Sequence, residues 1–200
     1  SDMICQMGEE EEKQEYMKIV SSNNELLLQL IDDILDLSKI EAGTMEFTFA
    51  PTDINELMEG ICRQMQEKNT SPDVAITFTE KATECIFHTD RVRLSQVIIN
   101  FTNNAMKFTS EGSIQMGYRI DETKDEIYFY VKDTGIGIPA DKIDEVFERF
   151  VKLNTFAKGT GLGLAICRVI VERLEGTIGA NSREGEGSCF WFRLPMHQKV

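Results

Sequence analysis

The stretch from Glu10 to Glu41 contains neither proline nor glycine, and it limits most narrowly what the chain can fold into. Its apolar residues recur at spacings of seven, three, four and three, which places them on one face of a helix. These residues are Val20, Leu27, Leu30, Ile34 and Leu37. Neighbouring apolar residues widen this stripe, and so broad an apolar surface needs two packing partners, as in a four-helix bundle. The sequence therefore predicts a long, dimerisation-type helix, ending before Gly43, that pairs with a second helix or a second chain.

Beyond Gly43, short strand and helix patterns alternate. Strands are predicted at 45–52, 74–79, 84–88, 113–120, 126–133, 177–182 and 188–194. Helices are predicted at 53–68, 90–109 and 161–174, with a short one from Pro139 to Phe150. Asp53 and Asp90 are the expected N-caps, and Gly176 the expected stop of the last helix. The later strands come in hairpin-like pairs. We therefore expect an α+β fold, a two-layer sandwich whose mixed sheet carries helices on one face.

Composition excludes several functional classes. The chain has 200 residues and a net charge of −13, which disfavours binding along a nucleic-acid backbone or on an anionic membrane. It contains no apolar run of the roughly 20 residues that span a bilayer, and its first residues do not resemble a signal peptide. The five cysteines lie far apart, without a CxxC pair, which favours a reducing compartment and no structural zinc.

The segment Asn100–Phe108 is the first candidate for chemistry. Asn100 and Asn104 are four residues apart, so they share one helix face, and Lys107 follows on the same face. Amide oxygens suit Mg²⁺, and a lysine beside them offers a point charge to a phosphate. Taken alone, the pattern is explained more simply by two asparagines that cap or pair within a helix.

Three glycine-containing segments come after it. Asp133 ends an apolar strand and precedes Gly135 and Gly137, so its carboxylate can accept from an exocyclic amine while the backbone lies close. Gly159–Leu164 enters a helix, where free N–H groups favour phosphate. Gly185–Ser188 lies in the last hairpin. Each segment could also be a simple turn or connector.

The order of these motifs is more specific than any one of them. A paired-Asn helix, an Asp-x-Gly-x-Gly turn, the FERF segment at 147–150, a GTGLGL helix entry and a final GxGS hairpin occur in sequence. Together they resemble the catalytic domain of sensor histidine kinases, within the wider Bergerat-fold ATPase family, over residues 45–195. The stretch 24–43 resembles the second dimerisation helix of the same kinases, particularly the hybrid type of two-component receptor.

The resemblance implies ATP and Mg²⁺ as cofactors and assigns roles by position. Asp133 would accept from the adenine amino group, beside Gly135, Gly137 and Phe108. Asn104 would bind Mg²⁺, with Asn100 and Lys107 near the phosphates. The stretch 151–159 would form a lid over ATP, and the helix entry would hold phosphate. The implied lid and entry residues are Lys152, Lys158, Gly159, Thr160, Gly161, Leu162 and Gly163.

The sequence departs from the family in two places. Kinases of this type phosphorylate a histidine on the first dimerisation helix, but the two histidines here are His88, at the end of a strand, and His197, in the C-terminal tail. We therefore expect residues 1–43 to be a truncated dimerisation hairpin, with residues 1–8 ending its first helix, and residues 44–200 to be the ATP-binding domain. Where relatives often place arginine, the lid has Lys152, which lacks the bidentate fork.

The resemblance implies a protein histidine kinase. It would transfer the γ-phosphate of ATP to a histidine outside these 200 residues, and from there the phosphate would pass to an aspartate of a response regulator. We expect ATP binding without autophosphorylation, a homodimer in the full-length protein, no nucleic-acid partner, and a cytoplasmic location as part of a membrane-anchored receptor. Two alternatives are a regulatory module that binds nucleotide without transfer and a hydrolysing ATPase of the same fold. Hydrolysis is disfavoured because Gln96 and Asn100 stand where such enzymes carry an acid.

Overall fold

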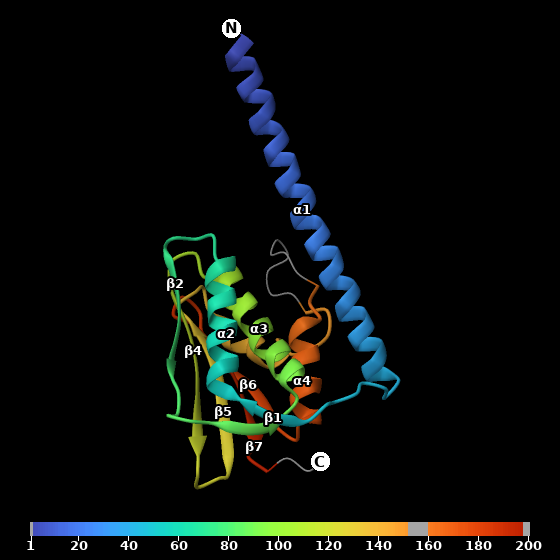
Figure 1. Ribbon diagram of the computed structural model, residues 1–200, viewed down its shortest axis with the longest axis vertical. Coiled ribbons are helices and arrows are strands. Elements are labelled where there is room, and N and C mark those ends of the chain that lie inside the picture. The colour runs from blue at the N-terminus through green and yellow to red at the C-terminus, as the bar shows by residue number, and fades with distance from the viewer. Residues whose placement is uncertain (1, 152–159, 198–200) are drawn as a thin grey trace. The chain divides into compact units, whose positions relative to one another are not determined.

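The computed structural model describes residues 2–151 and 160–197 and divides the chain into two compact units (Figure 1). One unit comprises Ser1–Met45 with Lys158–Thr160, and the other comprises Glu46–Ala157 with Gly161–Val200. The first unit is built on α1 (Asp2–Glu41).

Helix α1 confirms the long helix but extends it to Asp2. Residues 1–8 were expected to end a separate helix, and this was wrong because α1 is continuous from Asp2 to Glu41. Gly43, at φ 67°, ends the helix as predicted, since its N–H donates to the Ile40 carbonyl and that of Thr44 to the Lys39 carbonyl. The exposed apolar side chains of α1 are Tyr16, Met17, Ile19, Val20, Leu27, Leu28, Ile31, Ile34 and Leu35. No described helix is long and apolar enough to cross a membrane.

The second unit is built on a five-stranded sheet in the order β2-β4-β5-β7-β6, in which only β2 and β4 are parallel. The strands are β2 (Val74–Glu80), β4 (Gly112–Asp121), β5 (Glu126–Asp133), β6 (Thr177–Arg183) and β7 (Gly187–Pro195). A separate antiparallel pair consists of β1 (Ala50–Asp53) and β3 (Ile86–Thr89). The mixed sheet confirms the expected fold class.

Helices α2 (Ile54–Lys68), α3 (Arg91–Phe108) and α4 (Gly163–Arg173) lie side by side over one face of this sheet (Figure 1). The core forms where their apolar stripes meet the inward side chains of the strands. Phe101 of α3 lies 5.5 Å from Phe190 and 6.0 Å from Phe192 of β7, ring centre to ring centre. Burial of each such side chain contributes roughly 1.5–3 kcal/mol.

Both predicted N-caps are present. Asp53 accepts from the Glu56 N–H at 3.1 Å, and the buried Asp90 accepts from the Val92 and Arg93 N–H groups at 2.9 Å each. Each cap satisfies donors that the first helical turn leaves unpaired.

Several boundaries differ from the prediction, and three of the differences have a clear physical reason or change the element. The strand expected at 45–52 is confined to Ala50–Asp53, because the Thr48 N–H donates to the Asp90 carboxylate at 2.7 Å instead of to another strand. The helix expected to reach Phe150 is a 3₁₀ segment, η1 (Ala140–Glu145). At the end of α4 the left-handed residue is Glu175, at φ 59°, while Gly176 is the next residue and donates to the Val171 carbonyl at 2.8 Å.

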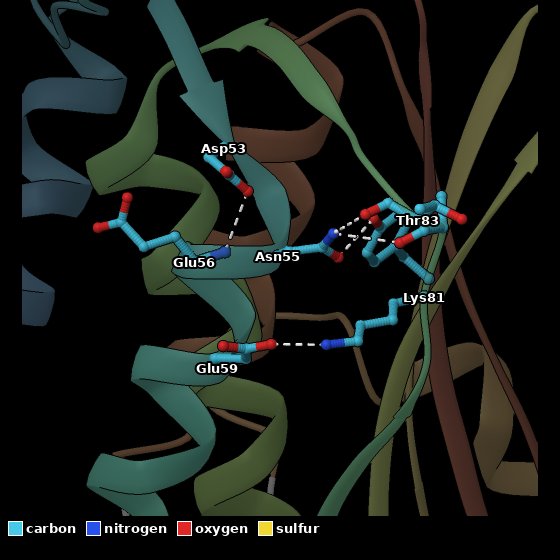
Figure 2. Close-up of polar contacts among 8 residues, drawn as sticks. Asp53, Asn55, Glu56, Glu59, Lys81 and Thr83 are labelled. Carbon is cyan, nitrogen blue, oxygen red and sulfur yellow. Dashed lines mark hydrogen bonds and ion pairs between the residues drawn. The ribbon is translucent and has the colours of Figure 1, made fainter.

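A buried polar contact joins α2 to the sheet and to the segment after β2. The Tyr118 hydroxyl on β4 donates to Asn55 Oδ1 at 2.7 Å, and Asn55 Nδ2 donates to the carbonyls of Ala82 and Thr83 at 3.1 and 3.3 Å (Figure 2). Burial raises the pKa of Tyr118 to about 12, so its hydroxyl stays a donor at neutral pH.

Replacing Asn55 with alanine should lower the free energy of unfolding by about 1–3 kcal/mol, because it leaves the fully buried Tyr118 hydroxyl without its acceptor. Urea unfolding followed by circular dichroism measures the change. Glu59→Ala is the matched control on the same helix, because it removes an exposed ion pair with Lys81 (Figure 2) and should cost at most about 1 kcal/mol. Equal losses in the two variants would contradict this account.

Candidate functional site

The second half of α3 carries the paired asparagines on one side of the helix. Asn100 and Asn104 are half-buried, and neither amide makes a hydrogen bond to a residue that the structure describes. Asn103 between them differs, since its Oδ1 accepts from Lys68 of α2 at 3.4 Å. The pair thus presents amide groups to a ligand, whereas the neighbouring asparagine joins two helices.

The start of α4 lies directly against Asn100. A β-carbon at Gly163 would come within 2.6 Å of both Asn100 Oδ1 and Nδ2, so a larger residue here would displace the Asn100 amide. The residue before it, Leu162, provides no side-chain cap for α4. Within the described part of the chain, no side chain caps α4, so its first N–H groups could face a ligand beside Asn100, an arrangement that favours phosphate.

Asp133 ends β5 as predicted and is 4% exposed. Its Oδ1 accepts two backbone N–H groups, from Gly135 at 2.9 Å and from Ser188 at 3.2 Å. Burial raises its pKa, and the two amide hydrogen bonds act in the opposite direction. No described residue donates to Oδ2, so this oxygen remains an acceptor for a ligand amine.

The turn after Asp133 packs on the end of α3. The Ile136 N–H donates to the Phe108 carbonyl at 3.2 Å, and a β-carbon at Gly135 would overlap the same carbonyl. Gly137 has a positive φ of 69° and lies against the Arg183 carbonyl. The two glycines thus hold Asp133 beside the C-terminal end of α3.

The other expected site residues lie in several places. Lys107 is exposed, and its Nζ lies 4.9 Å from the centre of the Phe108 ring. Thr160 is half-buried and groups with the first unit, whereas Gly161, Leu162 and Gly163 belong to the second. Gly161 accepts from the Phe150 N–H at 2.9 Å. The positions of Lys152, Lys158 and Gly159 fall outside the described residues.

These groups form a site with two chemically different ends. Asp133 lies near Phe108, and the helix entry lies at Asn100, which is eight residues away, or about 12 Å along α3. One end can accept a hydrogen bond from an amine, and the other has the helix start that suits a phosphate. An adenine nucleotide fits both. The described residues include no cluster of three or more histidines, cysteines or acidic residues that could hold a metal. Asn104 could offer one amide oxygen to Mg²⁺.

The sequence missed two residues of this site. Ser188 was read only as part of a turn, yet its amide is one of the two donors to Asp133. Ser182 lies on β6 and accepts from the Ile138 N–H at 2.8 Å. The GxGS motif was a signal for Ser188, but no local pattern pointed to Ser182.

Comparison with known proteins decides the family. The sequence profile described as "Histidine kinase-, DNA gyrase B-, and HSP90-like ATPase" matches residues 89–198. The chain belongs to this family. Among its relatives are hybrid signal transduction histidine kinase K of Dictyostelium discoideum, 35% identical over 94% of this chain, and circadian input-output histidine kinase CikA of Synechococcus elongatus, 36% identical over 92%. The chain spans only 17% and 25% of these two proteins.

Solved structures agree with this assignment. Full-length ShkA in complex with AMPPNP superposes with a TM-score of 0.81 and 28% identity, over 94% of this chain and 40% of that one. Histidine kinase ThkA in complex with the response regulator TrrA gives 0.72 and 26%, over 91% of this chain and 51% of that one. Within the ATPase family, the chain is an ATP-binding catalytic domain of the sensor histidine kinase type.

Asp133→Asn should reverse the preference of this ATPase-family domain between adenine and hypoxanthine nucleotides. Oδ1 would still accept from Gly135 and Ser188, so Nδ2 would take the place of Oδ2 and meet the adenine amine as a second donor. We expect ATP affinity to fall at least about tenfold and the affinity for inosine triphosphate, whose 6-oxo group accepts, to rise. Calorimetry with non-hydrolysable analogues measures both. Asp125→Asn, at an exposed turn, is the control, and an unchanged preference in Asp133→Asn would contradict this assignment.

Proposed function

We propose that this domain binds ATP with Mg²⁺ and transfers the γ-phosphate to a histidine on a dimerisation helix. The observation that carries the proposal is Asp133, a buried carboxylate with one oxygen held by two amides and the other left as an acceptor. The uncapped start of α4 beside Asn100 supports the phosphate end of the site. The histidine-kinase relatives, of which the chain spans a quarter or less, support the reaction class.

The residues of the site would act by orientation and charge. ATP would supply the phosphoryl group, whose transfer needs positioning and electrostatic stabilisation more than covalent help from the protein. Asp133 would fix the adenine by accepting from its amino group. The N–H groups at the start of α4 would face the phosphates, and Asn104 would supply one ligand to Mg²⁺.

Neither histidine of the 200 residues suits the acceptor role. His88 lies within β3, with its ring 6.2 Å from that of Phe49. His197 follows β7, and its Nδ1 lies 2.7 Å from Asp125 Oδ2. The acceptor histidine would therefore be on another segment or another chain, presented by the dimerisation bundle to which we assign residues 1–43. We assign residues 44–200 to the ATP-binding domain.

Hydrolysis by water is the weaker candidate. On α3 the side-chain oxygen of Gln96, Oε1, accepts from the Arg93 guanidinium at 2.9 Å, and the Asn100 side chain lies against Gly163. Neither side chain is an acid that could take a proton from water.

The partners follow from the reaction class. A receiver domain would take the phosphoryl group onto an aspartate, as suggested by the complex of ThkA with the response regulator TrrA. The exposed apolar face of α1 supports a homodimer through that helix. A cytoplasmic location would provide ATP, and it agrees with the free thiols of Cys62, Cys85 and Cys189.

Asn104→Ala should remove the Mg²⁺-dependent part of ATP-analogue binding, at least about tenfold, because a metal site loses that much even for an outer-shell partner. Calorimetry with and without Mg²⁺ measures the difference. Asn103→Ala is the matched control on the adjacent position, since Asn103 contacts Lys68 instead. If the two variants respond to Mg²⁺ alike, Asn104 is not its ligand.

The 200-residue chain, incubated with γ-³²P-ATP, should incorporate no acid-labile phosphate by itself. When the acceptor helix of a relative is supplied in trans, label should appear on that helix. Autoradiography of neutral gels measures both. Stable labelling of the chain alone would overturn the absence of self-phosphorylation. Saturable nucleotide binding without transfer to any supplied helix would favour the regulatory module.

A further inference from the structure

Two glycine motifs that are far apart in the sequence lie face to face. The loop after Asp133 meets the turn between β6 and β7, where the Gly185 N–H donates to the Ile136 carbonyl at 2.7 Å. Gly187, at φ 96°, lies so close to the Asp133 carbonyl that a β-carbon would overlap it. The position of Asp133 therefore depends on the last hairpin as well as on its own loop.

One hydroxyl joins the two motifs. Ser182 Oγ accepts from the Ile138 N–H at 2.8 Å, on the loop side. On the hairpin side it lies 2.9 Å from the Gly187 carbonyl oxygen and 2.9 Å from Ser188 Oγ. All three partners border the segments that supply amides to Asp133.

The hydrogen-bonding capacity of a serine fixes the direction of these bonds. A hydroxyl has one proton to donate and two lone pairs that accept. The three contacts are satisfied together when Ser182 donates to the Gly187 carbonyl and accepts from the Ile138 N–H and the Ser188 hydroxyl. Ser182 then has no capacity left for water or ligand, so its role is confined to holding its neighbours.

The consequence reaches Asp133 through backbone amides. The Ser188 N–H is one donor to Asp133 Oδ1, and it follows directly on the Gly187 carbonyl that Ser182 holds. The other donor, Gly135, belongs to the loop that Ser182 holds at Ile138. Because both amides bind the same oxygen, their placement determines which way Oδ2 points.

We propose that Ser182 is a positioning residue for adenine selectivity, acting on Asp133 through the Gly187–Ser188 and Gly135–Ile138 segments. This deepens the proposed function and rests on it. Loss of the hydroxyl would free the hairpin from the loop, and Asp133 would no longer present Oδ2 in one direction. The domain would then bind the triphosphate while discriminating poorly between 6-amino and 6-oxo purines.

The test compares Ser182→Ala with the intact chain in affinity for non-hydrolysable ATP and inosine triphosphate, both with Mg²⁺. Selectivity is the dissociation constant for the inosine triphosphate analogue divided by that for the ATP analogue. We expect this ratio to fall about tenfold in Ser182→Ala, which is the effect of one hydrogen bond. Ser182→Thr retains the hydroxyl and should restore the ratio. Thr123→Ala, which removes a hydroxyl bonded to Asp121 in the β4–β5 turn, is the matched control and should leave the ratio unchanged.

If Ser182 has a purely structural role, Ser182→Ala should lower the unfolding temperature and reduce the affinities for both nucleotides equally. An unchanged ratio in folded Ser182→Ala would therefore overturn the proposal. If that variant does not fold, Ser188→Ala decides, because it removes one of the three bonds and keeps the amide to Asp133. A partial fall in the ratio supports the proposal, and no fall overturns it. Absence of binding by the intact chain would instead refute the proposed nucleotide site.

Discussion

The pair of backbone hydrogen bonds to Asp133 Oδ1 is the interaction on which the site depends. A carboxylate that is 4% exposed is costly to bury, and burial raises its pKa. The amides of Gly135 and Ser188 offset part of that cost, because a carboxylate is a strong acceptor for N–H donors. The bond from Ser188 ties β5 to β7, and the bond from Gly135 holds the loop that follows β5. Both leave the second oxygen for a ligand. The feature that stabilises the buried charge therefore also orients it.

Helix α3 links this charge to the rest of the fold. Its apolar face buries Leu94, Phe101 and Ala105 over the sheet, while the half-buried Asn100 and Asn104 lie on one flank of that face. Asp90 sets where the helix begins, because its carboxylate binds the first-turn amides and also the Thr48 N–H. The periodicity of α3 thus places its apolar side chains in the core. It also places Asn100 and Phe108, which border the two ends of the proposed site, at separate positions along the helix.

Close backbone approach connects the separate motifs. Gly163 brings the start of α4 against Asn100, and Gly187 brings the hairpin against Asp133. A β-carbon at Gly187 would overlap the Asp133 backbone and force the hairpin away, whereas one at Gly163 would displace the Asn100 amide. Each of these glycines matters because of the polar residue that it approaches, and that residue lies in a different motif. One motif alone therefore carried little information, whereas the ordered set resembled one family.

The sequence by itself determined the elements that depend on local signals. Periodicity predicted α3 and β5, with Asp133 at the end of that strand, and the carboxylates of Asp53 and Asp90 predicted two helix starts. Tertiary structure decided what depends on distant partners. The Thr48 amide binds a side chain 42 residues away, which shortens β1, and Ser182 binds an amide 44 residues away. Ser188 reaches Asp133 across 55 residues. Local sequence does not encode such contacts, because they exist only after the sheet has brought the two segments together.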